Sequence, residues 1–254
     1  HGADPSAMTA LRLVQFTDTH LVGDPAGGIR GVATRDTLAR VIGRARSDLA
    51  AAEAVLLTGD VVHDDASGYD VARELLAPLG KPIWCLPGNH DEPGLMRAAL
   101  DSPPFAYCPV VDRGAWRIVL LDSVIPGATG GALARTELDR LERALTETSA
   151  HVLVVLHHQP LPARSRWLDP IGLADGAVFV ERLQRFPGVR GVLWGHVHQA
   201  HDETRGQLRC LGTPSTCVQF APDVPEFALD DRPPAYRRVT LHADGRIDSD
   251  VVWC

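Results

Sequence analysis

The sequence lacks long apolar runs, and it lacks any block of lysine and arginine. No stretch of the 254 residues reaches membrane-spanning length, and we expect no signal peptide. The net charge of -7 makes an extended nucleic-acid backbone a poor partner, although bound cations would still admit a compact anionic substrate. The sequence therefore predicts a protein that acts on a small molecule, with neither nucleic acid nor membrane as its partner.

Cysteine is scarce and widely spaced, with no C-x-x-C pair. The five residues are Cys85, Cys108, Cys210, Cys217 and Cys254. This odd number and spacing are typical of reduced thiols and argue against a disulfide framework, so we expect a cytoplasmic protein. Residues 1–7, ahead of Met8, are interpreted as a cloning remnant, and residues 8–254 as a single domain.

The first hundred residues alternate between strand and helix patterns. Apolar runs predict strands over Leu11–Phe16, Ala54–Leu57 and Pro82–Leu86, and helical periodicity appears over Thr34–Ala52 and Gly68–Leu79. This order predicts a mostly parallel sheet with right-handed crossovers. Further helices are expected over Pro93–Leu100, Leu133–Thr146 and Ala177–Phe186, and further strands over Ala106–Val111, Ala115–Asp122, Val152–Leu156, Val189–Trp194, Gln207–Leu211, Tyr236–His242 and Arg246–Trp253. The predicted fold is a layered α/β sandwich of two mixed β-sheets flanked by α-helices.

Short polar segments follow five of these apolar runs. They are Asp18-Thr19-His20, Gly59-Asp60, Gly88-Asn89-His90-Asp91, His157-His158 and Gly195-His196-Val197-His198. The carboxyl ends of parallel strands meet along one edge of a sheet, so we expect these segments to share one crevice. Side chains at i and i+2 of a strand point to the same face, which pairs Asp18 with His20 and His196 with His198.

The polar side chains in these segments are of the kinds that bind metals. The candidate ligands are Asp18, His20, Asp60, Asn89, His157, His196 and His198. Seven ligands exceed the need of one ion with an open position, and they suit two ions about 3.5–4 Å apart that share a carboxylate. Imidazole, carboxylate and amide oxygen without thiolate favour Mn, Fe, Zn or Co over Mg or Ca, with Fe and Mn preferred. The sequence therefore predicts a metal-dependent enzyme.

Glycine stands immediately before a candidate ligand at positions 59, 88 and 195. Glycine permits a close backbone approach or an unusual φ where a strand turns sharply into a site. The alternative interpretation is an ordinary turn at the end of each strand.

In this order, the motifs D-x-H, G-D, G-N-H-D, a strand-terminal H and G-H-x-H resemble those of the calcineurin-like metallophosphoesterases. The resemblance covers nearly all of Leu11–Trp253. Within that superfamily the sequence is most similar to the bacterial class III 3′,5′-cyclic AMP phosphodiesterases. The stretches that carry this finer resemblance are Gln15–Leu21, Trp167–Asp169, Thr213–Phe220 and Leu241–Gly245. Thr213–Phe220 lies outside the metal motifs and is therefore the better evidence for the substrate class.

The resemblance implies hydrolysis of a 3′,5′-cyclic nucleotide, cyclic AMP to 5′-AMP, by a hydroxide that bridges two metal ions. It assigns Asp18, His20, Asp60 and His198 to one metal, and Asp60, Asn89, His157 and His196 to the other. It also implies catalytic roles for His90, Asp91 and Asn89. His90 would bind phosphate and protonate the leaving 3′-oxygen, and Asp91 would orient or charge His90. The expected substrate-binding residues are Asn89, His90, His20 and His198.

Several neighbouring residues have two interpretations. His158 replaces His157 as a ligand if the strand ends one residue later, and Asp64 is a candidate hydrogen-bond acceptor for a ligand histidine. His63 lies either at the mouth of the site or in solvent. Trp167 and Phe220 either flank a nucleobase or belong to the core.

Two other functions remain open. The same ligands would serve a glycerophosphodiesterase, a generic phosphodiesterase or phosphomonoesterase, or a nucleoside polyphosphate hydrolase, because they handle the phosphoryl group and not its substituents. A protein-binding scaffold with this fold would not need metals, but here the ligand set is complete. A homodimer is also considered, through the edge formed by Ala106–Asp122 or by the C-terminal strands.

Overall fold

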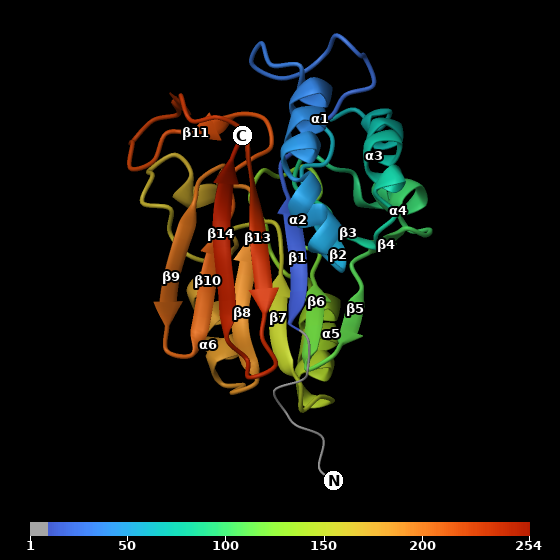
Figure 1. Ribbon diagram of the computed structural model, residues 1–254. Helices are drawn as coiled ribbons and strands as arrows, with labels where there is room; N and C mark the ends of the chain where they lie inside the picture. Colours follow the sequence, from blue (N-terminus) through green and yellow to red (C-terminus); the bar gives the residue numbers. More distant parts are fainter. Residues whose placement is uncertain (1–9) are drawn as a thin grey trace.

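Two six-stranded mixed sheets pack face to face, and helices cover their outer sides (Figure 1). The computed structural model describes residues 10–254, and the expected cloning remnant lies outside the described residues. The first sheet has the order β14 (Ile247–Trp253), β13 (Ala235–Leu241), β1 (Leu11–Phe16), β2 (Ala54–Thr58), β3 (Ile83–Leu86) and β4 (Phe105–Tyr107). Strands β1 to β4 are parallel, and β13 runs antiparallel to both β1 and β14.

The second sheet is built in the same way, with a parallel centre. Its order is β5 (Val110–Arg113), β6 (Trp116–Leu120), β7 (His151–Val155), β8 (Val189–Trp194), β10 (Leu208–Gly212) and β9 (His201–Arg205). The edge strands β5 and β9 are antiparallel to their neighbours. A short hairpin, β11 (Gln219–Phe220) with β12 (Leu229–Asp230), lies at the end of the molecule toward which β1 points (Figure 1). The predicted fold class is confirmed.

Alternate residues of the central strands enter two different cores. In β1, Leu11 and Leu13 face the second sheet, whereas Val14 and Phe16 pack under the helices. Strands buried on both faces are mostly apolar, which is why they appear in the sequence as nearly continuous apolar runs. The helices on the first sheet are α1 (Thr34–Arg44), α2 (Arg46–Ala51), α3 (Gly68–Leu76) and α4 (Pro93–Leu100), and those on the second are α5 (Arg135–Thr146) and α6 (Gly176–Gln184). Single 3-10 turns cover Ala77–Leu79 and Asp169–Ile171.

Two of the expected elements differ clearly from the structure, and one observed edge strand was not expected. The helix predicted over residues 34–52 breaks at the buried Ala45 into α1 and α2. The strand predicted over residues 106–111 is wrong, because the chain leaves the first sheet at Cys108, whose φ is 45°, and enters the second at β5. Strand β9 was not expected, since its polar, mostly exposed residues show no apolar alternation.

The dimer expected through a sheet edge stays a prediction. Within residues 10–254, no helix is both long and apolar enough to cross a bilayer.

Candidate metal centre

Strand ends from both sheets meet at one buried cluster of acidic and imidazole side chains. Asp18, Asp60 and Asn89 follow β1, β2 and β3 of the first sheet. The histidines of the cluster that follow strands of the second sheet are His157, His196 and His198. Two sets of ligand atoms each lie within 4.8 Å of one another: those of Asp18, His20 and His198, and those of Asp60, His157 and His196. The five polar segments therefore share one crevice, and each sheet supplies part of it.

Asp60 lies between the two sets. Its Oδ2 is 3.3 Å from Nε2 of His157 and 3.8 Å from Nε2 of His20. In the other set, Nε2 of His198 is 3.2 Å from Oδ1 of Asp18 and 3.2 Å from Nε2 of His20. One carboxylate thus faces both sets of ligands, which is the arrangement that two ions with a shared ligand require.

Backbone carbonyl groups orient three of the imidazoles. Nδ1 of His157 donates to the Thr58 carbonyl at 2.8 Å, and Nδ1 of His198 donates to the Val218 carbonyl at 2.6 Å. His196 is turned the other way, with Nε2 donating to the Ile171 carbonyl at 3.0 Å. In each ring the second nitrogen keeps its lone pair for the crevice, as ligand histidines do.

Within the described residues, three atoms of the cluster that could coordinate a metal are buried and make no hydrogen bond. They are Oδ1 of Asp18, Oδ1 of Asn89 and Nε2 of His157. Buried polar atoms in native proteins nearly always have a partner, because an unpaired one is costly. All three atoms are of types that coordinate transition metals, so the residues present fit a two-metal centre.

The electrostatics of the cluster also suit cations. Although burial opposes ionisation of Asp18, the neighbouring His198 and His157 hold its pKa at about 2. Burial lowers the pKa of His20 to about 3 and that of His196 to about 4. His157 behaves oppositely, because Asp60 and Asp18 outweigh its burial and raise its pKa to about 9. An ionised Asp18 beside neutral His20 and His196 has the protonation states that metal ligands need, whereas His157 must release its proton when a metal binds.

The backbone is strained at most of these ligands. Asp18, His20, Asp60, His196 and His198 all have φ between 46° and 66°. Left-handed backbone is uncommon in residues other than glycine and costs about 1–3 kcal/mol at each position. Such strain concentrates at functional sites, where the surrounding structure holds side chains in positions that a relaxed strand end would not give.

Close contacts require glycine at all three of the positions before the ligands, and Gly195 and Gly59 are the examples. A Cβ at Gly195 would lie 2.1 Å from Oγ1 of Thr17 and 2.6 Å from Oδ2 of Asp18. At Gly59, φ is 90° and a Cβ would lie 2.4 Å from Nδ1 of His157. The geometry therefore supports close approach over the ordinary-turn interpretation.

His90 lies at the open side of the cluster, and its partner differs from the expected one. Both carboxylate oxygens of Asp64 lie 3.1 Å from Nδ1 of His90. Asp91 instead accepts hydrogen bonds from the backbone amides of Val61, Val62 and Gly88 and from the Tyr69 hydroxyl. The expected contact between Asp91 and His90 is thus corrected, because the Asp91 side chain turns into the protein and ties the loops after β2 and β3 together. Asp64 likewise serves His90 and not a ligand histidine.

Two further histidines were left open by the sequence. Both ring nitrogens of His158 are engaged, by the Ser123 hydroxyl at 2.8 Å and the Thr129 carbonyl at 3.2 Å. His157 is therefore the histidine of this pair that faces Asp18 and Asp60. His63 lies at the mouth, with Nδ1 3.0 Å from Nδ1 of His20 and its ring stacked on His90 at 4.5 Å.

An aromatic cluster adjoins the second sheet's side of the site. Phe220 stacks on the His198 ring at 4.0 Å, and Trp167 meets Phe220 edge to face at 5.2 Å. Phe227 completes this cluster, 5.2 Å from Trp167, and Arg30 lies over its ring at 4.4 Å. Phe227 and Arg30 were not expected, because both lie in loops without a motif.

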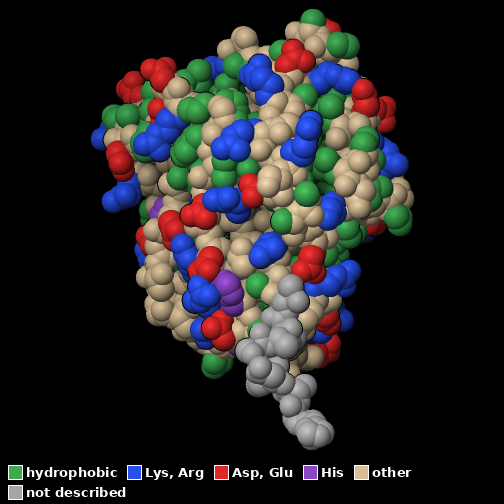
Figure 2. All heavy atoms as spheres, viewed as in Figure 1, with side chains coloured by type: hydrophobic (Ala, Val, Ile, Leu, Met, Phe, Trp, Pro, Cys, Tyr) green, Lys and Arg blue, Asp and Glu red, His purple; other side chains and the backbone are tan. Residues whose placement is uncertain are grey.

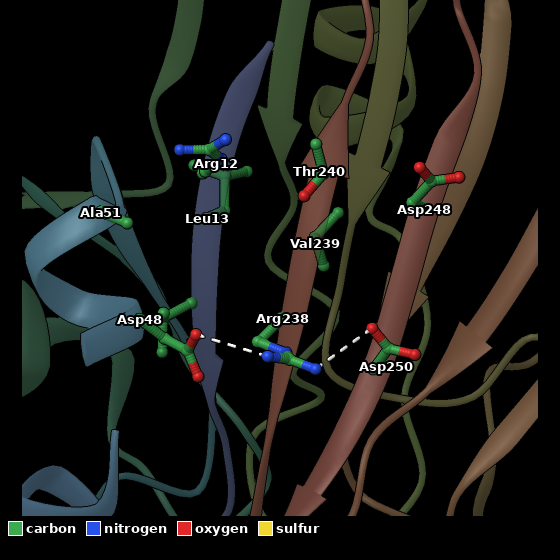
Figure 3. Close-up of a pocket in the computed structure, with 10 residues that line it drawn as sticks. Arg12, Leu13, Asp48, Ala51, Arg238, Val239, Thr240, Asp248 and Asp250 are labelled. Carbon is green, nitrogen blue, oxygen red and sulfur yellow. Dashed lines mark hydrogen bonds and ion pairs between the residues drawn. The ribbon is translucent and has the colours of Figure 1, made fainter. Parts of the chain in front are cut away.

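The surface has two notable hollows, of which one lies apart from this chemistry and one adjoins it. A groove of about 440 Å³ lies on the outer face of β1, β13 and β14, where Arg238 bridges Asp48 and Asp250 (Figure 3). It contains none of the clustered ligands. On the same face, acidic and basic side chains are intermingled (Figure 2). A smaller hollow of about 220 Å³ is lined by Asp64, Asn89 and His90 and borders the metal centre directly.

Comparison with known proteins agrees with this geometry. Residues 11–200 match the family model of the calcineurin-like phosphoesterases. The 3′,5′-cyclic adenosine monophosphate phosphodiesterase CpdA of Pseudomonas aeruginosa is 40% identical, over 99% of this chain and 93% of that protein. CpdA of Escherichia coli K12 is 37% identical, over 95% of this chain and 89% of its own length.

Solved structures share the fold at much lower identity. A dimetal phosphatase from Danio rerio superposes with a TM-score of 0.66 at 16% identity, covering 98% of this chain and 99% of that one. A purple acid phosphatase from yellow lupin gives a TM-score of 0.64 at 15% identity, covering 98% of this chain and 55% of that one. With the family model and the full-length relatives in agreement, the chain belongs to the calcineurin-like phosphoesterase family.

Proposed function

We propose that this protein is a dinuclear-metal phosphodiesterase that hydrolyses 3′,5′-cyclic AMP to 5′-AMP. The observation that carries the proposal is the position of Asp60 between two buried sets of ligand atoms, with His90 at their open side. The relatives named as cyclic AMP phosphodiesterases support the substrate, because they match over nearly the whole chain. Reduced thiols, with Cys85, Cys210 and Cys217 buried and free, support a cytoplasmic location.

In this proposal Asp18, His20, Asp60 and His198 hold one ion. Asp60, Asn89, His157 and His196 hold the other, with Fe or Mn preferred and Zn or Co as alternatives. The unpartnered oxygens of Asp18 and Asn89 and the unpartnered nitrogen of His157 support this assignment. When bound, the ions supply a Lewis acid for the phosphoryl oxygens and lower the pKa of water. Because both sheets contribute ligands, we regard the whole sandwich as one catalytic domain.

The chain's own residues complete the reaction. His90, held through Nδ1 by Asp64, presents its other ring nitrogen toward the substrate and protonates the departing 3′-oxygen. Asn89 binds the phosphate beside His90, and His20 and His198 line the same side of the crevice. Asp91 acts by position, since its hydrogen bonds to Val61, Val62 and Gly88 hold the loops that carry Asp60 and Asn89.

The test compares three phosphodiesters with the Mn-loaded protein. We expect turnover of cyclic AMP, followed as 5′-AMP release, to exceed turnover of bis(p-nitrophenyl) phosphate and of glycerophosphodiesters in kcat/KM. Poor turnover of cyclic AMP beside efficient turnover of glycerophosphodiesters would replace the proposed substrate and keep the metal chemistry. Absence of bound metal after purification without chelators, together with no activity after Mn is added, would favour the scaffold alternative.

A further inference from the structure

The proposed function explains the metal ligands and His90 but leaves the aromatic cluster beside them without a role. Trp167, Phe220 and Phe227 come from three separate segments: the loop after β7, strand β11, and the connection between β11 and β12. Phe220 joins this cluster directly to the metal centre, because its ring lies parallel to that of His198, with an interplanar angle of 9°. The cluster is therefore a continuation of the crevice wall.

Phe227 differs from an ordinary core ring. The residue is 40% exposed, although the ring centres of Trp167 and Phe220 lie 5.2 and 5.4 Å from the centre of its ring. A large aromatic ring that is fixed by neighbours yet open to solvent offers a preformed stacking surface.

Arg30 extends this surface beyond the Phe227 ring. Its guanidinium lies 4.4 Å from the centre of the Phe227 ring, and within residues 10–254 no carboxylate pairs with it. One exposed cation thus borders the aromatic cluster.

We propose that Phe227 and Arg30 form a nucleobase-binding wall, with Trp167 and Phe220 as its support. This inference rests on the proposed function and names the substrate class of the same site: a nucleotide whose phosphate lies at the metal centre. Planar bases stack on aromatic rings and on guanidinium planes, and this tolerates different bases because every base has a π face. The wall therefore binds the base and adds no hydrogen bonds that would select adenine.

Binding of the reaction product distinguishes the contribution of the nucleobase-binding wall from that of the metal centre. Inorganic phosphate reaches only the metals, whereas 5′-AMP reaches both, so the two ligands are titrated by calorimetry into the Mn-loaded protein. We expect Phe227→Ala to weaken 5′-AMP about tenfold and to leave phosphate unchanged, since removal of one stacking partner has an effect of this order. Phe227→Tyr keeps the ring and should restore 5′-AMP binding.

Arg30→Ala provides a second variant, because its side chain is exposed and its loss does not endanger folding. It should also weaken 5′-AMP and spare phosphate. Val178→Ala, at another exposed apolar residue on α6, is the matched control and should change neither ligand. Equal losses of affinity for 5′-AMP and phosphate would contradict the proposed nucleobase-binding wall. Unchanged affinity for 5′-AMP in both Phe227→Ala and Arg30→Ala would contradict it as well.

The same variants distinguish failure of the wall from failure of the proposed function. If the wild-type protein does not hydrolyse cyclic AMP, yet Phe227→Ala selectively loses 5′-AMP, the wall stands and the reaction is reassigned to another nucleotide. If the wild-type protein hydrolyses cyclic AMP and both variants match it in kcat/KM and in 5′-AMP affinity, the function stands and the wall is wrong.

Discussion

At the scale of single residues, the proposed function assigns some side chains to the metals and others to the substrate. Asp60 is buried and faces both sets of ligands, whereas His90 is partly exposed and held by Asp64. This division predicts different consequences for the loss of each side chain.

Asp60→Ala should lose metal and all activity, because neither ion retains its shared ligand. His90→Ala should keep both metals while kcat falls about 10²- to 10⁴-fold, the usual contribution of a positioned proton donor. Metal analysis and turnover of the two purified variants check this pair. Loss of metal from His90→Ala would mean that His90 is itself a ligand.

His63 leads to a second prediction at this scale. It hydrogen-bonds Nδ1 of His20 and so fixes the ring whose Nε2 faces the metal centre. His63→Ala should weaken metal binding about tenfold, as the loss of a ligand's hydrogen-bond partner commonly does. His63→Gln can still hydrogen-bond and should recover most of the affinity. Competition with a metal chelator measures both variants, and equal affinity in wild type and His63→Ala would exclude this role.

The candidate ligands could be predicted from the sequence because each follows an apolar run, and parallel strands bring such ends together. The hydrogen-bond and packing partners of the site residues could not be predicted in this way. Asp64 reaches His90 from the loop after β2, and Phe227 meets Trp167 across a gap of 60 positions, so no local pattern records either contact. The left-handed backbone of the candidate ligands could not be predicted from the sequence either, since few Asp and His residues adopt it.

At the scale of elements, the strand ends bring the candidate ligands together because the chain turns sharply after each strand. The predicted strands β1, β2, β3, β7 and β8 all lie within a residue of the observed ones, since burial on both faces makes them mostly apolar. Elements that depend on long-range packing were less predictable, such as the crossing from β4 to β5 at Cys108.

Gly195→Ala tests the tight turn after β8. Its Cβ would meet Thr17 and Asp18 at distances that force the two strand ends apart, so we expect a loss of about 1–3 kcal/mol in the free energy of unfolding, together with weaker metal binding. Gly43→Ala is the matched control. Gly43 lies in α1 with no atom near its Cβ position, and alanine there should stabilise the protein by about 0.5–1 kcal/mol. Urea denaturation compares the two, and equal stability of Gly195→Ala and wild type would refute the crowding argument.

At the scale of the whole molecule, the metal centre lies across the junction of two sheets. Asp18 and Asp60 belong to one sheet and His157 and His198 to the other, so bound ions connect the two halves of the sandwich. An ion that binds only the folded protein raises its stability by about 2.7 kcal/mol at a hundred times its Kd.

Removal of the metals should therefore lower Tm and should also leave His157 protonated at neutral pH, since Asp60 and Asp18 raise its pKa to about 9. Differential scanning calorimetry with and without a chelator measures the change in Tm, and added Mn should reverse it. An unchanged Tm in the chelated protein would show that the two sheets do not depend on the ions.

The pairing of β1 with β13 has a consequence for how the chain folds. Leu11 lies opposite Leu241. Strand β1 therefore pairs with its antiparallel neighbour β13 only after the long stretch of chain between them has brought its ends together. Closing so long a loop carries an entropic penalty that delays the contact, and domains dominated by such distant pairings fold slowly. During synthesis on the ribosome, β1 and β2 emerge long before β13. Strand β1, which leads to Asp18, therefore remains with one edge unpaired until β13 is made. The metal centre is also completed late, because His196 and His198 lie far along the chain from Asp18.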